Sequence, residues 1–193
     1  MKETLENLAR AFIGESIARN RYQFFAKVAK KEGYEQLAEA LLLTADNERE
    51  HASWTFKLIT ALKSTTEAPS EKRVGVALPS TFGDTATNLK AAIQDEHYEQ
   101  TTMYPGFADV ADREGLPEIA KRLRAIARAE AHHEERNRKM LAQVEAGTFF
   151  KKDRPVEWLC RECGYVHVGE EPPEKCPACD HDRAYYQLLH EEY

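Results

Sequence analysis

Glutamate and histidine recur in this chain at a spacing that suits metal binding. Glu48 and His51, like Glu130 and His133, are three residues apart, so on a helix both side chains of a pair leave the same face. One further glutamate precedes each pair at almost the same distance, Glu15 before the first and Glu96 before the second. A glutamate from each of two helices, with Glu-x-x-His from two others, is the ligand arrangement of di-metal carboxylate centres.

These ionisable residues fall where a helical core is expected. Apolar side chains at steps of three and four mark the inner face of four predicted helices, and the ionisable side chains occupy the middle of each face. Burying one unpaired carboxylate costs roughly several kcal/mol, whereas two cations of charge two or three would supply the compensating charge. Solvated surface glutamates are the alternative, and the repeated pairing argues against it.

Glu99 is a surplus carboxylate one turn beyond Glu96, since the basic arrangement needs only six ligands. A surface position is the alternative to metal binding. If one iron can choose between Glu99 and His51, the site contains a redox switch, because oxidised iron prefers an anionic oxygen and reduced iron accepts a neutral imidazole. The hydroxyls of Tyr22 and Tyr104 either hydrogen-bond a ligand or a bound peroxide, or belong to ordinary core tyrosines.

Four cysteines form two CxxC pairs near the C-terminus, Cys160 with Cys163 and Cys176 with Cys179. Four thiolates at this spacing form a tetrahedral all-sulfur site, which suits zinc or a single iron. A structural zinc ribbon is one interpretation. Gly-Tyr after the first pair and the proline within the second favour a rubredoxin type of iron site.

Four long helices are predicted to position the carboxylates. They span about residues 3–31, 34–63, 84–114 and 117–146. The connections within each half are short and make antiparallel hairpins, whereas the middle connection is long enough to cross a bundle, as in ferritin-like folds. The fold class expected is therefore an all-α four-helix bundle with a small β-rich metal module, and Pro105 should distort the third helix.

Composition and charge narrow the class of protein. The net charge of −6 argues against nucleic-acid and anionic-membrane partners. No apolar run approaches the ~20 residues of a membrane span, and the N-terminus lacks a signal-peptide pattern, so we expect a cytoplasmic protein. Helical periodicity ends near residue 152, which predicts a bundle domain over 1–152 and a cysteine domain over 153–193.

Taken in order, these motifs resemble the rubrerythrin family over essentially the whole chain. The carrying segments are AFIGES (11–16), ARNRY (18–22), EREHA (48–52), EHYE (96–99), MYP (103–105), ARAEAHHE (127–134) and the cysteine module (160–179). The order, bundle first and rubredoxin-like module last, is the usual one of the family. Asp180 departs from the pattern, because free rubredoxins usually have glycine after the second knuckle, and this puts hydrogen bonding to sulfur in doubt there.

The resemblance implies two kinds of iron site. The implied di-iron ligands are Glu15, Glu48, His51, Glu96, Glu99, Glu130 and His133, and the implied ligands of a single iron are Cys160, Cys163, Cys176 and Cys179. Glu48 and Glu130 would bridge the two irons, with or without an oxo bridge. The implied catalytic residues are Glu99 and His51, which exchange as ligands, and Tyr22 and Tyr104. Zinc is the alternative ion at the cysteine site in recombinant preparations.

The family further implies a peroxidase that reduces hydrogen peroxide to water in defence against oxidative stress. Electrons would pass through the rubredoxin-like iron, from NAD(P)H by way of a separate reductase or rubredoxin. A homodimer is implied, arranged head-to-tail, with helix-swapped or higher assemblies as variants. The alternatives are a ferritin-like ferroxidase or iron-binding protein and a zinc-loaded structural protein. The fused one-electron module favours the peroxidase, since a ferroxidase takes its electrons from substrate iron.

Overall fold

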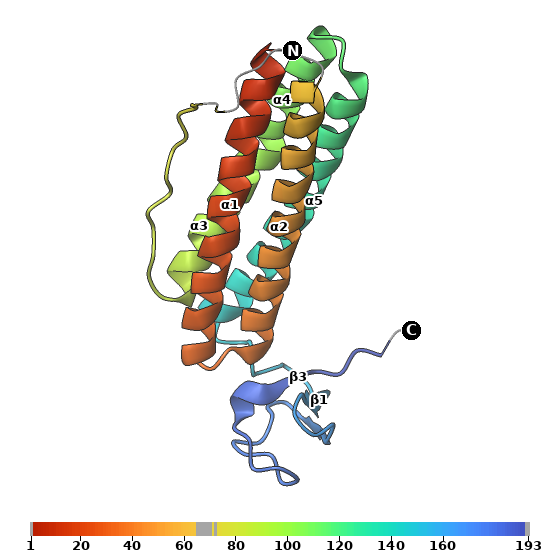
Figure 1. The fold of residues 1–193 in the computed structure, drawn as a ribbon. Helices are drawn as coiled ribbons and strands as arrows, with labels where there is room; N and C mark the ends of the chain where they lie inside the picture. The colour runs from red at the N-terminus through yellow and green to blue at the C-terminus, as the bar shows by residue number, and fades with distance from the viewer. Residues whose placement is uncertain (1, 65–70, 72, 192–193) are drawn as a thin grey trace.

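The computed structural model describes residues 2–64, 71 and 73–191, and its larger part is helical (Figure 1). The helical elements are α1 (Lys2–Lys31), α2 (Glu35–Ser64), α3 (Thr85–Tyr98), the π-helical segment η1 (Glu99–Met103), α4 (Tyr104–Arg113) and α5 (Pro117–Glu145). Helices α1 and α2 form one antiparallel hairpin, and the column α3-η1-α4 forms the other with α5. The predicted four-helix bundle is confirmed.

Two apolar clusters lie at opposite ends of the bundle and leave its middle to polar groups. One cluster contains Leu5, Leu8, Leu62, Ala108, Ile119, Leu123 and Ile126. The other contains Phe25, Ala29, Leu37, Leu41, Leu89 and Ala92. Burial of apolar surface on both sides, at about 25 cal/mol per Å², stabilises the helices and can offset the cost of placing carboxylates between the clusters.

The third predicted helix is interrupted, which corrects the single helix expected over 84–114. The π-helical turn η1 separates α3 from α4, and the backbone N–H of Tyr104 donates to the carbonyl of Glu99 across this wider turn. Pro105 therefore lies in the first turn of α4, where its missing N–H and fixed φ do little harm. The expected distortion is present, and a π turn inside a helix is often found at a functional site.

The helix ends follow the expected signals. Asp84 caps α3, its side chain accepting a hydrogen bond from the backbone N–H of Thr87 at 2.7 Å. Gly33 and Gly115 adopt positive φ angles of 86° and 74° two residues after the ends of α1 and α4, a conformation that glycine adopts at low cost. These sharp turns set the antiparallel pairing of the helices.

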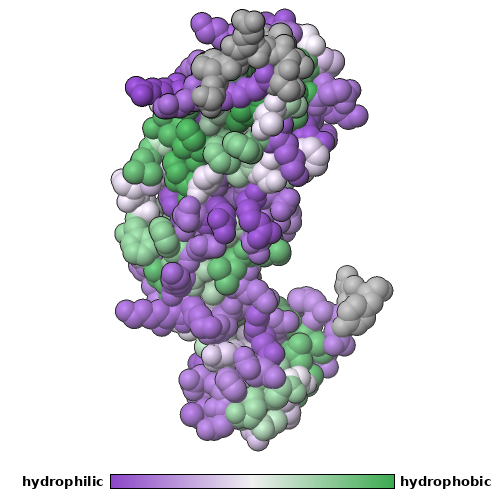
Figure 2. All heavy atoms as spheres, viewed as in Figure 1, coloured by the Kyte–Doolittle hydropathy of each residue, from purple (hydrophilic) through white to green (hydrophobic). Residues whose placement is uncertain are grey.

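Residues 73–83, which we call the crossover strap, form the described end of the connection between the hairpins. The strap runs along the outside of α1 and α3 (Figure 1). Figure 2 shows a largely hydrophilic surface on which apolar side chains gather along this flank. Residues 65–70 and 72 of the segment predicted as a crossover lie outside the described residues. No helix in the described ranges is long and apolar enough to cross a membrane.

A small antiparallel sheet forms the C-terminal module at one end of the bundle (Figure 1). Its strands are β1 (Val156–Cys160), β2 (Val166–Gly169) and β3 (Tyr186–Leu188), in the order β2-β1-β3, and the 3-10 helix η2 (Arg183–Tyr185) precedes β3. Trp158 and Tyr186 fill its core. Arg161 donates to Glu39 of α2, which ties the module to the bundle. The boundary at residue 152 stays a prediction.

Candidate metal centres

Six of the predicted ligands meet in the polar middle of the bundle. They form two groups of four residues, and the ligand atoms of each group lie within 4.8 Å of one another. The first group contains Glu15, Glu48, His51 and Glu130, and the second contains Glu48, Glu96, Glu130 and His133. The groups share two glutamates, so the bundle brings together two adjacent metal sites.

The two shared glutamates span both sites with opposite oxygens. Glu48 places Oε2 at 2.9 Å from Nδ1 of His51 and Oε1 at 3.0 Å from Nδ1 of His133. Glu130 places Oε1 at 2.9 Å from Nδ1 of His51 and Oε2 at 2.9 Å from Nδ1 of His133. A carboxylate that offers one oxygen to each of two neighbouring sites is arranged as a bridging ligand.

The other two glutamates each belong to one site. Glu15 Oε2 lies 3.8 Å from Nδ1 of His51, and Glu96 Oε1 lies 3.8 Å from Nδ1 of His133. Both side chains are buried, and Glu15 Oε2, Glu96 Oε2 and both oxygens of Glu130 make no hydrogen bond to any group in the described part of the chain. Buried oxygens without donors around a shared centre fit a pair of cations, which carboxylate and imidazole ligands suit.

Two tyrosines hold the terminal glutamates from across the bundle. The hydroxyl of Tyr22 on α1 donates to Glu96 on α3, and that of Tyr104 on α4 donates to Glu15 on α1. Asn137 on α5 donates to the Tyr22 hydroxyl at 2.8 Å. The tyrosines are therefore more than filling of the core, because each fixes one carboxylate of the other hairpin.

The cluster perturbs the acidity of its own members. Burial raises the pKa of Glu15 to about 8, against the attraction of the nearby His51. Burial also acts to raise the pKa of Glu48, but hydrogen bonds from His133 and His51 lower it to about 2. Burial and the neighbouring imidazoles thus shift the pKa values of two carboxylates of one cluster in opposite directions, because charges interact strongly in a low-dielectric space.

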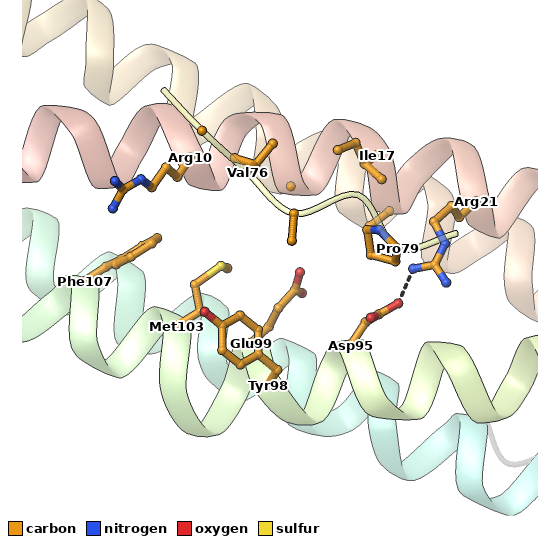
Figure 3. A pocket seen from close by; sticks show the side chains of 14 residues that line it. Arg10, Ile17, Arg21, Val76, Pro79, Asp95, Tyr98, Glu99, Met103 and Phe107 are labelled. Atoms are coloured by element: carbon orange, nitrogen blue, oxygen red, sulfur yellow. Dashed lines mark hydrogen bonds and ion pairs between the residues drawn. The ribbon is translucent and has the colours of Figure 1, made fainter. Parts of the chain in front are cut away.

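Glu99 belongs to neither group of four, but its carboxylate is close enough to interact electrostatically with Glu15, Glu130 and Glu48. It begins the π-helical turn, is partly exposed and lines a cavity beside α1 and the strap. Figure 3 shows its carboxylate pointing from η1 towards the strap. Of the two predicted exchange partners, His51 is thus a member of one group, whereas Glu99 borders the cluster, and a ligand role for Glu99 stays a prediction.

A buried carboxylate that sequence reasoning missed lies beside the cluster. Glu134, on α5, has a side chain only 5% exposed and accepts hydrogen bonds from Gln100 at 2.6 Å and from Arg138 at 2.8 Å, with His97 Nδ1 at 3.2 Å. Gln100 belongs to η1, so this network ties the π-helical turn to α5. The sequence spacing could have predicted this buried position, because Glu134 is four residues beyond Glu130 and shares its helix face.

The four cysteines form the second metal site. The Sγ atoms of Cys160 and Cys179 are 3.7 Å apart, and those of Cys163 and Cys176 are 3.6 Å apart. These distances exclude disulfides, whose sulfurs are about 2.05 Å apart, and match the ~3.8 Å edge of a tetrahedron with metal–sulfur bonds of about 2.3 Å. The donor set therefore fits a single tetrahedral metal ion.

The surroundings of Cys176 favour its thiolate form. Burial acts to raise the pKa of the Cys176 thiol, but the Tyr186 hydroxyl and nearby backbone N–H groups lower it to about 6. Asp180 adopts a left-handed φ of 61°, as glycine would, and the backbone N–H of His181 still hydrogen-bonds to Cys179. The unusual aspartate therefore leaves the local bonding pattern in place.

Comparison with known proteins places both sites in one family. The rubrerythrin family model matches residues 6–141, and the model described as the rubredoxin-like domain of rubrerythrin matches residues 158–187. A putative rubrerythrin of Methanocaldococcus jannaschii is 61% identical over 100% of this chain and 96% of that protein. A rubrerythrin of Nitratidesulfovibrio vulgaris is 42% identical over 96% of this chain and 94% of that protein.

Solved structures agree with the sequence relatives. A mixed-valence nigerythrin structure matches with a TM-score of 0.64 at 32% identity, covering 96% of this chain and 86% of that one. A fully reduced, all-ferrous nigerythrin structure gives the same TM-score, identity and coverage. The carboxylate-histidine site is thus a di-iron site and the cysteine site is of the rubredoxin type, and the chain belongs to the rubrerythrin family.

Proposed function

We propose that this protein is a peroxidase that reduces hydrogen peroxide to water at its di-iron centre, in defence against oxidative stress. Each peroxide takes two electrons and two protons, and cleavage of its O–O bond yields two water molecules. The observation that carries the proposal is the combination of a two-metal centre with a one-electron cysteine centre in one chain. The rubrerythrin relatives support an oxidoreductase of this kind.

The two groups of ligands would each hold one iron. Glu15 and His51 would complete one site and Glu96 and His133 the other, because Glu48 and Glu130 reach both. Two bound irons supply one electron each, which matches the need of one peroxide molecule. The cysteine site would hold a third iron through Cys160, Cys163, Cys176 and Cys179.

The protein's own groups position the ligands and admit the substrate. Tyr22 and Tyr104 hold Glu96 and Glu15 by hydrogen bonds, which keeps the terminal carboxylates in place. Glu99 and His51 each border an opening towards solvent, so both proposed exchange ligands have room to move. The glutamates of the two ligand groups are almost fully buried, which supports the proposal that the exchange involves Glu99 and His51.

The separation of the two centres supports a homodimer. The cysteine module lies at the end of the bundle where α2 begins, whereas Glu48 lies about 20 Å farther along that helix at 1.5 Å per residue. We propose that the cysteine iron of one subunit serves the di-iron centre of another, in a head-to-tail arrangement. The proposed electron donor is a separate NAD(P)H-linked reductase or rubredoxin, and the proposed location is the cytoplasm.

The experiment that tests this function is stopped-flow mixing of the fully reduced protein with hydrogen peroxide and, separately, with dioxygen. We expect the di-iron centre to be reoxidised faster by peroxide. Faster oxidation by dioxygen, or turnover only with added ferrous iron, would instead indicate the ferroxidase alternative. That alternative rests on the bundle alone and leaves the cysteine centre without a role.

Glu99→Ala tests the exchange-ligand role. We expect this variant to slow reoxidation by peroxide at least tenfold, because oxidised iron would lose an anionic oxygen ligand. The absorption of the cysteine iron should be unchanged and serves as the control for folding and loading. A variant that reacts at the wild-type rate would contradict the switch.

A further inference from the structure

A cavity of about 440 Å³ lies beside Glu99, between α1, the column of η1 and α4, and the crossover strap (Figure 3). Most of the side chains around it are apolar, and the lining residues come from α1, the strap, α3, η1 and α4. The principal apolar lining residues are Ile17, Val76, Pro79, Met103 and Phe107. Figure 3 shows them surrounding the side of Glu99 that faces the strap.

The cations at this cavity have anionic partners close by. Arg21 forms an ion pair with Asp95, which also lines the cavity, and Arg10 forms an ion pair with Glu6 at 2.7 Å. Positive charge that is already paired attracts a free anion weakly. Together with the carboxylate of Glu99, this arrangement favours an uncharged ligand with one polar end.

The cavity is much larger than hydrogen peroxide requires. A water molecule occupies about 30 Å³ in the liquid, so a molecule with two oxygen atoms takes up about 60 Å³. Sites for organic ligands are typically about 300–1,000 Å³, mainly apolar, with a few polar groups that fix orientation. In size and lining this cavity resembles a site for an organic ligand.

We propose that the cavity binds organic hydroperoxides, with the hydrocarbon group against the apolar walls and the O–O group towards Glu99. This inference rests on the proposed peroxidase function and extends its substrate class. The O–O bond of ROOH breaks on uptake of two electrons from the reduced irons and two protons, and the products are the alcohol ROH and water. Molecules the size of tert-butyl or cumene hydroperoxide suit the volume.

Kinetics with two peroxides test the inference separately from the proposed function. Fully reduced, iron-loaded protein is mixed in a stopped-flow instrument with hydrogen peroxide or with cumene hydroperoxide. We expect reoxidation by both. Reoxidation by hydrogen peroxide alone would overturn the substrate class and leave the peroxidase proposal standing, whereas reoxidation by neither would overturn the peroxidase proposal itself.

Val76→Trp tests whether the cavity is the binding site, because the larger ring would fill part of it from the strap. The ratio of the cumene hydroperoxide rate to the hydrogen peroxide rate should fall at least tenfold. Leu78→Trp is the matched control: Leu78 is on the same strap, is 72% exposed and lies outside the cavity lining, so the ratio should not change. An equal loss with both peroxides in Val76→Trp would overturn the cavity assignment.

Binding gives a readout that does not depend on turnover. Isothermal titration of the oxidised, iron-loaded protein with 2-phenyl-2-propanol, the alcohol product of cumene hydroperoxide, should show saturable binding. Val76→Trp, and Ile17→Phe from α1, should weaken this binding at least fivefold, and Leu78→Trp should not. Saturable binding that is unchanged in both cavity variants, or no binding to the wild type, would contradict the proposal.

Discussion

The two metal centres of this protein are built in opposite ways. The di-iron site draws its ligands from four helices, with Glu15 and Glu130 far apart in sequence, and lies between two large apolar clusters. The cysteine site draws all four ligands from residues 160–179 and has a small core of its own. The bundle around the di-iron site is already stabilised by apolar packing. The small module around the cysteine site depends for its stability largely on the bound metal.

Metal removal should produce the largest difference between the two regions. Removing the metal from the cysteine site, by chelation or by Cys163→Ser, is expected to unfold the module, since small modules without a large core depend on metal binding worth about 10–16 kcal/mol. The bundle should keep its helical circular dichroism. NMR spectra of the two regions would measure the effect, with Glu162→Gln as the matched control. A folded module in Cys163→Ser would show that the three strands can fold without the metal.

Glu48→Ala and Glu15→Ala should differ in their loss of iron from the bundle. Glu48 reaches both histidines, so its removal should empty both sites, whereas Glu15 serves one and its removal should leave about one iron per bundle. Metal analysis after dialysis would measure this, with the cysteine iron as internal reference. Equal losses in the two variants would argue against the bridging arrangement.

Tyr22→Phe should destabilise the bundle more than Tyr104→Phe. Removing the Tyr22 hydroxyl leaves a Glu96 oxygen and the Asn137 amide without this partner, whereas removing that of Tyr104 affects Glu15 alone. Each buried polar group left without its partner costs about 1–3 kcal/mol. Denaturant unfolding of both variants would measure which one loses more unfolding free energy. We expect the same ranking with and without bound iron. The reverse order would mean that the Asn137 contact contributes little.

The smallest effect is expected at a bundle end, remote from both centres. Glu114 accepts hydrogen bonds from the backbone N–H groups of Glu3 and Thr4, the latter at 3.0 Å, and so caps α1. Burial acts to raise its pKa, but its hydrogen bonds, to which those from Thr4 and Glu3 contribute, lower it from 4.5 to about 2. A lowered folded-state pKa means that the stabilisation is present above pH 4.5 and is lost as pH falls towards 2.

Glu114→Gln should therefore lower the unfolding free energy at pH 7 by about 0.5–1 kcal/mol, the usual value of such a cap. The difference from wild type should shrink as pH falls below 4.5. Thermal unfolding at several pH values would measure it, with the exposed Glu118→Gln as control. If the loss of unfolding free energy in Glu114→Gln does not depend on pH, packing rather than the carboxylate charge causes it.

Much of the fold followed from patterns within the sequence. Hydrophobic periodicity, the helix-ending residues Gly33 and Gly115 and the N-cap Asp84 predicted the helices and their pairing, because these signals act over a few residues. The π-helical turn at Glu99–Met103 was not predicted. Pro105 indicated a distortion, but whether a helix kinks or inserts a wider turn depends on what packs against it, here Gln100 and its contact with Glu134 of α5.

The sequence by itself identified the residues that come together in the two metal sites, since Glu-x-x-His and CxxC spacings constrain ligands on one helix face or within one knuckle. Only the tertiary structure decided how they are shared: that Glu48 and Glu130 each face two sites, and that Tyr22 and Tyr104 hold glutamates of the other hairpin. It also placed Glu99 at a cavity walled by the crossover strap. These relations join residues far apart in the chain, and contacts of that kind are fixed by packing between helices rather than by local spacing.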